Sequence, residues 1–217
     1  MPVYRQTKLI HIHIPKTSGT AIERFFHSIG DMVWGRESWL GQEFLDQRWY
    51  EFQHLSMTEL LNFTGEEFRY FHSFAVIRNP YSRLVSDFLW RGTLNPQLNV
   101  LFDSFEEFVQ AIPLKIDTRW PIYLRKASKR RTNYLIHVRP QHHYVCTQSG
   151  EQVVKDLLKF ERLKPDFDRL LAQHGLKTDM ITTPQERNFK AYFDRDMLDR
   201  VNMIYAQDFK LGSYEML

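Results

Sequence analysis

The residues best suited to chemistry lie in a short loop near the start of the chain, at positions 15–20 (PKTSGT). A β-branched segment, residues 8–14, precedes this loop and predicts a strand, and a helical pattern follows at residues 20–28. Backbone N–H groups in such a loop and at the start of a helix attract anions. Lys16 adds a full positive charge, and Gly19 allows close approach to the backbone. The sequence therefore predicts an anion-binding loop, with a helix whose start Thr17 or Ser18 can cap and which Gly30 ends.

A second strand–turn–helix pattern occupies residues 71–90 and contains the segment FAVIRNPYSRLVSDF. Arg78 ends the predicted strand, and Pro80 stands where a first helical residue tolerates proline. The planar guanidinium of an arginine suits a phosphate group. Ser86 lies about two helical turns further along and can reach the same phosphate. Arg83, between them, is expected to be a solvated helix residue.

The order of residues in the loop is not that of a Walker A motif, whose lysine comes late and after an upstream glycine. It resembles the 5′-phosphosulfate loop of sulfotransferases that use 3′-phosphoadenosine-5′-phosphosulfate (PAPS), in the carbohydrate (Golgi-type, sulfotransferase family 2-like) branch with its bacterial relatives. The segment around Arg78 resembles the 3′-phosphate motif of the same family. The resemblance implies PAPS as co-substrate, no metal, and the following donor-binding residues: Lys16, Thr17, Ser18, Gly19, Thr20, Ala21, Arg78 and Ser86.

Three further segments resemble the same branch, so the resemblance runs nearly end to end. They are Arg-Pro-Gln-His at 139–142, Phe-Glu-Arg-Leu at 160–163, and the C-terminal stretch 201–214. Arg139 and His142 of the first segment are predicted to bind the acceptor, which is expected to be a glycan or another hydroxyl compound.

Sulfuryl transfer to a hydroxyl group requires a base, and histidine titrates in the useful range. His54 lies between the two donor motifs, just before a predicted helix at residues 57–62. In the branch that this chain resembles, a histidine in that intervening region is the base, so His54 is predicted to be catalytic together with Lys16. His142 is the second choice, and a surface histidine ahead of a helix is the alternative interpretation of His54. His11 and His13 alternate on one strand face, which favours packing.

Strands that alternate with helices predict an α/β fold: a single P-loop-like domain over residues 1–217, with a central parallel β-sheet flanked by helices on both faces. Further predicted elements are a strand at 153–160 and helices at 104–111, 166–173 and 194–206. Ser104 followed by Glu107 forms a capping-box pattern at the start of the first of these helices.

The net charge is only +3, but residues 118–150 contain no acidic residue. This stretch carries seven basic side chains: Arg119, Arg125, Lys126, Lys129, Arg130, Arg131 and Arg139. Such a field attracts an anionic acceptor or the donor phosphates, although a solvated basic face explains it equally well. The aromatic residues Trp120, Tyr123 and Tyr134 suit either sugar stacking or the core. A single cluster in a near-neutral chain gives little support to a nucleic-acid partner, and none is predicted.

The chain has one cysteine, Cys146, which excludes an intrachain disulfide. It shows no signal-peptide pattern and no apolar run long enough to span a membrane. A cytoplasmic protein without stable membrane insertion is therefore expected, or the soluble part of an anchored one. Two other functions stay open at this point: a P-loop-like kinase that uses ATP and magnesium, and a non-catalytic module that binds acidic glycans.

Overall fold

The computed structural model describes residues 2–32, 42–45, 48–64, 67–93, 102–115 and 129–217. A four-stranded sheet lies at its centre with the order β1(Val3–Tyr4), β2(Leu9–Ile12), β5(His72–Ile77) and β6(Asp156–Lys159). β2, β5 and β6 are parallel, as predicted, and β1 pairs with β2 in the antiparallel sense. The antiparallel edge strand was not predicted, since two residues give no periodicity.

The three parallel strands end at the same edge of the sheet, where Ile12 pairs with Ala75 and Ile77 pairs with Lys159. In sheets of this type ligands bind outside the carboxyl ends of the strands. The loop at residues 15–20 and Arg78 both follow such strand ends, so the fold brings the two sequence motifs together.

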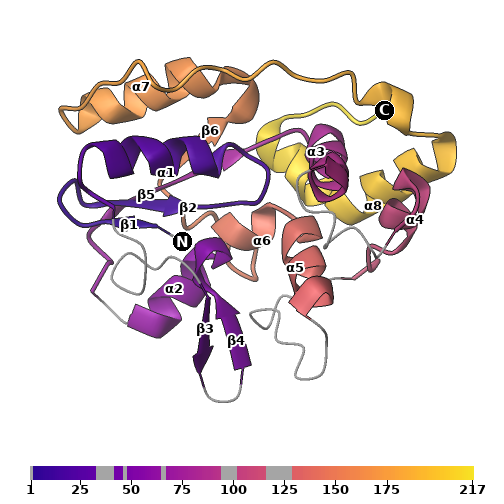
Figure 1. The fold of residues 1–217 in the computed structure, drawn as a ribbon, viewed down its shortest axis with the longest axis horizontal. Helices are drawn as coiled ribbons and strands as arrows, with labels where there is room; N and C mark the ends of the chain where they lie inside the picture. Colours follow the sequence, from indigo (N-terminus) through magenta and orange to yellow (C-terminus); the bar gives the residue numbers. More distant parts are fainter. Residues whose placement is uncertain (1, 33–41, 46–47, 65–66, 94–101, 116–128) are drawn as a thin grey trace.

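One face of the sheet is covered by α1(Gly19–Ser28) and α7(Leu163–Gln173) (Figure 1). Their apolar side chains pack on β-strand side chains such as Phe74 and Val76. The residues that the helices bury there are Ile22, Phe25, Phe26, Leu163, Phe167, Leu170 and Leu171. Gly30 has a φ of +75° and ends α1 as predicted, because glycine adopts the left-handed region without strain.

The opposite face is covered by α2(Met57–Thr64) and the short α6(His142–Val145). Ile10, Ile12 and Ile14 of the first parallel strand and its extension point to this side. They meet apolar side chains of both helices, namely Met57, Leu60, Tyr144 and Val145. Helices therefore flank both faces of the sheet, as the alternating pattern predicted.

A group of helices packs beside the sheet, on the right of Figure 1, and has an apolar cluster of its own. It consists of α3(Pro80–Thr93), α4(Phe105–Gln110), α5(Lys129–Val138) and α8(Arg195–Gly212). Pro80 is the first residue of α3, and the Ser104 side chain accepts from the Glu107 N–H at the start of α4, as predicted. α5 falls in the acid-free stretch and was not predicted as a helix.

The remaining elements are short. β3(Gln42–Leu45) and β4(Arg48–Glu51) form a two-stranded antiparallel sheet that leads into η2(Phe52–His54). η3(Phe160–Arg162) precedes α7, and η4(Lys190–Tyr192) precedes α8. Among the described residues, no helix has both the length and the apolar character needed to cross a membrane.

Arg83 corrects one expectation, since this arginine is buried rather than solvated. Its Nη2 donates to the carbonyl of Arg139 at 2.7 Å, and its guanidinium lies 5.8 Å from the Tyr205 ring centroid. The amphipathic pattern of α3 indicated one buried stripe only. α8 and the segment after α5 cover a second side of α3, which a pattern within the helix does not reveal.

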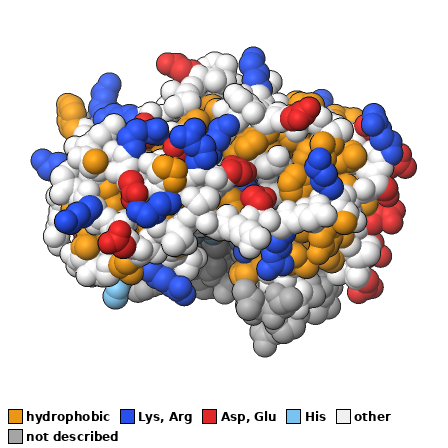
Figure 2. All heavy atoms as spheres, turned by 90° about the horizontal axis from the view of Figure 1, so that it is seen from above, with side chains coloured by type: hydrophobic (Ala, Val, Ile, Leu, Met, Phe, Trp, Pro, Cys, Tyr) orange, Lys and Arg blue, Asp and Glu red, His pale blue; other side chains and the backbone are white. Residues whose placement is uncertain are grey.

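The surface above α7 carries lysine and arginine side chains mixed with acidic ones rather than gathered in one patch (Figure 2). The first third of the acid-free stretch, residues 118–128, lies outside the described residues, including Trp120, Tyr123 and the basic residues at 119, 125 and 126. Tyr134 is described, and it is a core residue whose hydroxyl donates to the Phe108 carbonyl at 2.7 Å. A sugar-stacking role for Tyr134 is therefore wrong, because its ring is enclosed in the helical cluster.

Candidate active site

The predicted donor loop, residues 15–20, has an unusual backbone. Lys16 has a φ of 68° and Ser18 a φ of 74°, both in the left-handed region that costs a non-glycine residue roughly 1 kcal/mol. Alternation between left- and right-handed residues turns successive backbone N–H groups toward one side, which makes an anion-binding concavity. The first N–H groups of α1, those of Gly19 and Thr20, also have no acceptor inside the helix.

The expected side-chain cap of α1 is wrong. Ser18 occupies the N-cap position, but its side chain makes no capping hydrogen bond. A capping serine needs extended backbone angles, and the left-handed φ of Ser18 turns its hydroxyl elsewhere. The Thr17 hydroxyl is turned inward and donates to the Ile14 carbonyl at 2.8 Å, which ties the loop to the strand.

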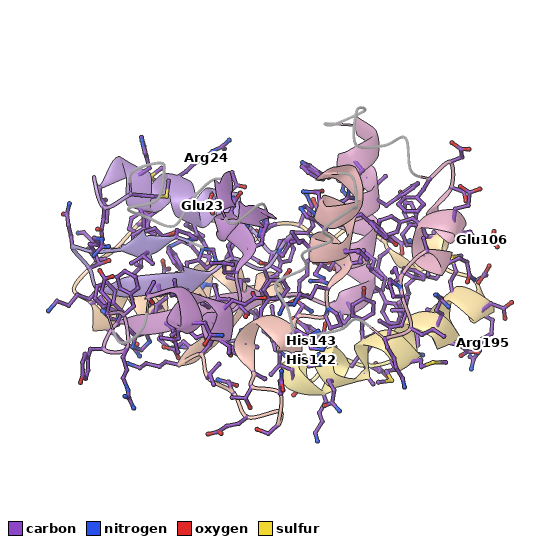
Figure 3. The ribbon with its side chains drawn as sticks, turned by 90° about the horizontal axis from the view of Figure 1, so that it is seen from below. Glu23, Arg24, Glu106, His142, His143 and Arg195 are labelled. Atoms are coloured by element: carbon purple, nitrogen blue, oxygen red, sulfur yellow. The ribbon has the colours of Figure 1, made fainter. Side chains whose placement is uncertain are left out.

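Gly19 allows close approach to its backbone, as predicted, but the group that approaches it in the structure is the His13 side chain. A Cβ atom at Gly19 would lie 2.0 Å from Nε2 of His13, so only glycine fits against this ring. Nδ1 of His13 donates to Glu23 at 2.6 Å, and the Gln53 amide donates to the same carboxylate at 3.2 Å. Figure 3 shows Glu23 beside Arg24 on α1; Glu23 is buried and Arg24 is exposed.

His54 is buried at the end of η2, beside the donor loop. Its Nδ1 lies 2.8 Å from the carbonyl oxygen of His13. A carbonyl only accepts, so Nδ1 carries the hydrogen and Nε2 carries the lone pair. Burial, and then the neighbouring His13 and His137, hold the pKa of His54 well below its ordinary value. The ring is therefore neutral at physiological pH, which is the form that a general base requires.

Lys16 points across the site, with Nζ 4.7 Å from the centroid of the Trp90 ring. The pKa of Lys16 is lowered to about 8: burial lowers it most, Asp87 raises it in opposition, and Arg78 and Arg91 add to the lowering. Lys16 is mostly charged at neutral pH and loses its charge as the pH rises through about 8.

Arg78 joins the second motif to the first, because its Nη1 donates to the carbonyl oxygen of Lys16 at 3.2 Å. Its Nε donates to the Ser82 hydroxyl at 2.8 Å and to Glu186 at 3.1 Å. The guanidinium also stacks 3.8 Å from the Phe160 ring centroid. Burial lowers the pKa of Arg78, and the Glu186 carboxylate raises it in opposition.

Ser86 lies half-buried one turn beyond Ser82 on α3. The hydroxyl that contacts Arg78 is therefore that of Ser82, which the sequence prediction did not single out. The other donor-loop residues of the prediction, Thr20 and Ala21, lie in the first turn of α1, with Thr20 exposed.

The three downstream segments that resemble the family stabilise the backbone around Arg78. The Gln141 side chain clamps its backbone, accepting from the Arg78 N–H at 2.9 Å and donating to the Arg78 carbonyl at 2.7 Å. The Asn79 N–H donates to Glu161 at 2.9 Å, and the Tyr214 hydroxyl donates to the same carboxylate at 2.8 Å. All three downstream segments thus converge on the strand end at Arg78.

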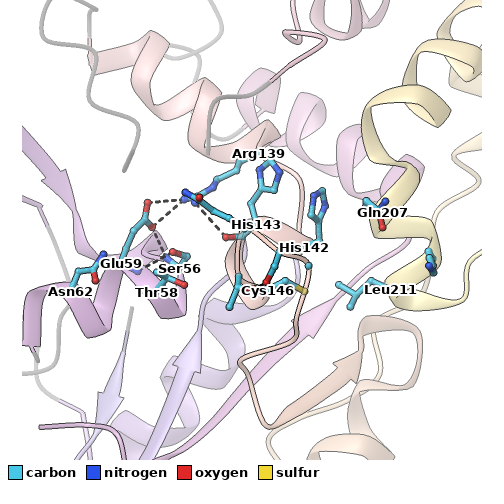
Figure 4. A pocket seen from close by; sticks show the side chains of 15 residues that line it. Ser56, Thr58, Glu59, Asn62, Arg139, His142, His143, Cys146, Gln207 and Leu211 are labelled. Atoms are coloured by element: carbon cyan, nitrogen blue, oxygen red, sulfur yellow. Dashed lines mark hydrogen bonds and ion pairs between the residues drawn. The ribbon is translucent and has the colours of Figure 1, made fainter. Parts of the chain in front are cut away.

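Arg139 and His142 line a separate cavity of about 780 Å³ between α2, α6 and α8 (Figure 4). Arg139 is buried, and its Nη1 donates to both oxygens of Glu59 at 3.1 Å. Nδ1 of His142 donates to Asp208 at 2.7 Å. The cavity wall otherwise consists mainly of hydroxyl and amide side chains: Ser56, Thr58, Asn62, Thr147, Gln148, Ser149 and Gln207.

Two residues near the donor loop were missed by the sequence analysis. Asp87 on α3 accepts from Nδ1 of His137 at 2.6 Å and from Nε of Arg91 at 2.9 Å. An aspartate four residues before an arginine is a local signal that could have indicated the Asp87–Arg91 pair. His137 lies 50 residues away along the chain and gave no such signal. Within the described residues, no group of three or more histidine, cysteine, aspartate or glutamate side chains could hold a metal ion.

The sheet, the glycine-containing loop at the end of its first parallel strand and the arginine at the end of the next define an α/β protein with a candidate anion-binding site at one sheet edge. A family model described as "Sulfotransferase family" matches residues 2–215. The chain therefore belongs to the sulfotransferase family, whose members transfer sulfuryl groups. No curated protein and no solved structure matched the chain.

Proposed function

We propose that this chain transfers a sulfuryl group from PAPS to a hydroxyl group of an acceptor, with a carbohydrate as the acceptor class. The contact that carries the proposal is the hydrogen bond from Arg78 to the carbonyl of Lys16 at 3.2 Å. It joins two motifs that lie more than sixty residues apart in the sequence. A donor with phosphate groups on the 3′ and 5′ positions of its ribose needs two such anion sites side by side.

In the proposed reaction the acceptor oxygen attacks sulfur as the bond between sulfur and the 5′-phosphate oxygen breaks. The proton of the acceptor hydroxyl goes to Nε2 of His54, whose tautomer the His13 carbonyl fixes. The charge that develops on the leaving phosphate is stabilised by the Lys16 ammonium and by the backbone N–H groups of the donor loop. Adenosine 3′,5′-bisphosphate (PAP) is then the product.

The other residues proposed to bind PAPS are assigned from their positions in the loop, in α1 and in α3. Thr17, Ser18, Gly19, Thr20 and Ala21 are proposed to hold the 5′-phosphosulfate through the loop and the first turn of α1. Arg78 and Ser86 are proposed to hold the 3′-phosphate. No metal is part of the proposal, because a lysine and backbone N–H groups provide the positive field.

On the acceptor side, Arg139 and His142 are proposed to bind substrate from the cavity between α2, α6 and α8. Arg139 is held by Glu59, so it shapes the wall rather than offering an additional charge. The Nδ1 hydrogen of His142 is used by Asp208, which leaves Nε2 to accept from a ligand hydroxyl. A wall of hydroxyl and amide groups suits a hydroxyl-rich compound.

The function is tested by thermal shift of the purified chain in the presence of a metal chelator. PAP is expected to stabilise the protein without magnesium, and ATP is not. Stabilisation by ATP with magnesium but not by PAP would contradict the proposal and indicate a kinase. Sulfur-labelled PAPS supplied with a panel of glycans, lipids and small alcohols then identifies the acceptor, and label in a glycan is the expected outcome.

Glu186 provides a sharper test of the 3′-phosphate site, because its carboxylate lies on Arg78 where that phosphate is proposed to bind. Its Oε2 is buried without a hydrogen-bond partner in the described part of the chain. Glu186→Gln removes a competing negative charge and is expected to tighten PAP binding roughly two- to tenfold. Adenosine 5′-phosphate, which lacks the 3′-phosphate, is expected to bind equally well to both proteins in calorimetric titrations.

The matched control is Glu151→Gln, the same change at an exposed glutamate. It is expected to alter neither affinity. If Glu186→Gln changed the affinities for PAP and adenosine 5′-phosphate by the same factor, Arg78 would not be the 3′-phosphate site.

A further inference from the structure

A buried polar cluster, formed by Asp87, Arg91 and His137, lies next to Lys16 and His54. Asp87 is 1% exposed and accepts hydrogen bonds from His137 and Arg91, at 2.6 and 2.9 Å. Burial alone would raise the pKa of Asp87, but His137 and Arg91 together hold it well below the ordinary value, so Asp87 is ionised at neutral pH. A buried charged cluster is costly to form, so its position beside the two proposed catalytic residues calls for an explanation.

His137 connects this cluster to both residues. Its ring lies 5.5 Å from the His54 ring, edge to face, and stacks on the Trp90 ring at 5.1 Å. Trp90 also contacts the Lys16 ammonium, which lies 4.7 Å from the indole centroid. A continuous series of contacts therefore runs from His54 through His137 and Trp90 to Lys16, and Asp87 fixes its central ring.

The charges around Lys16 make Asp87 important in a second way. Two cations face Lys16, Arg78 from the end of β5 and Arg91 from α3, and both disfavour its charged form. Asp87 is the anion that opposes them. His54 and His137 also face the cluster, from η2 and α5, and both carry their hydrogen on Nδ1 when neutral.

We propose that Asp87 and His137 are a positioning pair for sulfuryl transfer, which holds Lys16 and His54 in place relative to each other and puts a buried negative charge beside Lys16. The inference rests on the proposed function, because it takes the roles of Lys16 and His54 from it. Asp87 and His137 act through these two residues and do not touch donor or acceptor.

The test uses Asp87→Asn, in which an amide oxygen of the same shape can still accept from His137 while the charge is lost. PAP affinity is measured by calorimetry from about pH 7 to about pH 10, above the range in which the phosphates titrate. In the wild-type protein the affinity is expected to fall as the pH rises through about 8, because Lys16 loses its proton there. Removal of Asp87 lowers the pKa of Lys16, so the fall is expected to begin roughly one pH unit lower.

Asp166→Asn is the matched control, since Asp166 is a buried carboxylate on α7 that accepts from the Lys159 N–H at 3.0 Å. It is expected to destabilise the protein without moving the pH dependence of PAP binding. If Asp87→Asn does not fold, the double variant Asp87→Asn with Arg91→Met removes both charges of the Asp87–Arg91 ion pair. Its fall in affinity is expected to begin at a lower pH than in the wild type, because Asp87 affects Lys16 more strongly than Arg91 does.

A folded Asp87 variant whose affinity falls over the same pH range as the wild type would overturn the positioning pair. Failure of the wild-type protein to bind PAP at any pH would instead refute the proposed function. The two outcomes are therefore distinguishable.

Discussion

Alanine in place of Lys16 is expected to slow sulfuryl transfer by roughly 10²–10³-fold, the range found when one stabilising group is removed from a developing oxyanion. The Lys16 ammonium is the full positive charge of the donor loop, and its contact with Trp90 holds it at a fixed place. Without this ammonium, only the backbone N–H groups of the loop stabilise the charge on the departing 5′-phosphate. The measurement is the initial rate of label transfer from PAPS at saturating acceptor.

Lys8→Ala is a suitable control, because Lys8 is exposed and has a left-handed φ of 54°, close to the 68° of Lys16. Both substitutions place alanine in the same backbone region, so the comparison isolates the side chain. Wild-type turnover in Lys16→Ala would exclude Lys16 as the group that stabilises the leaving phosphate.

The change His54→Asn is expected to reduce kcat by roughly 10²–10⁴-fold, the usual contribution of a positioned general base. The asparagine amide can replace Nδ1 as donor to the His13 carbonyl, but it has no counterpart of the Nε2 lone pair. PAP affinity is therefore expected to change little, and the loss falls on kcat. His27→Asn, the same change at an exposed histidine of α1, is expected to be silent.

The pH dependence gives a second measurement on His54. A base must be unprotonated, and the pKa of His54 is held well below the ordinary 6.5 by burial. Wild-type transfer is therefore expected to continue as the pH falls through 6.5 and to decline only at lower pH. A near-normal kcat in His54→Asn would assign the proton transfer to another histidine, with His142 the next to be tested.

Much of the structure around Lys16 and Arg78 could be predicted from the sequence, because local sequence determines both strand–turn–helix units. Lys16 and Arg78 each follow a buried strand, and parallel strands end at one edge of a sheet. Their meeting therefore follows from the fold class once β2 and β5 are neighbours. The capping of α4 by Ser104 and the helix start at Pro80 were also local signals, and both are confirmed.

Contacts between distant segments could not be predicted in the same way. Glu186 and Arg78 are 108 residues apart, and nothing near either one indicates the other. His137 and Asp87 depend on how α5 packs against α3. The inward turn of Thr17 and the left-handed φ of Ser18 depend on how the loop fits against the strand end, so the residue types that normally cap a helix gave the wrong prediction.

The His13 ring has a consequence for how the donor loop behaves before any nucleotide arrives. His13 precedes the loop and Glu23 lies in the helix after it, so their 2.6 Å hydrogen bond closes the loop from outside. The His13 ring fills the space beside Gly19, and inside the loop the Thr17 hydroxyl donates a hydrogen bond to the Ile14 carbonyl. The loop is thus preorganised: its conformational entropy is lost when the chain folds, and the proposed nucleotide would meet a loop whose shape is already set.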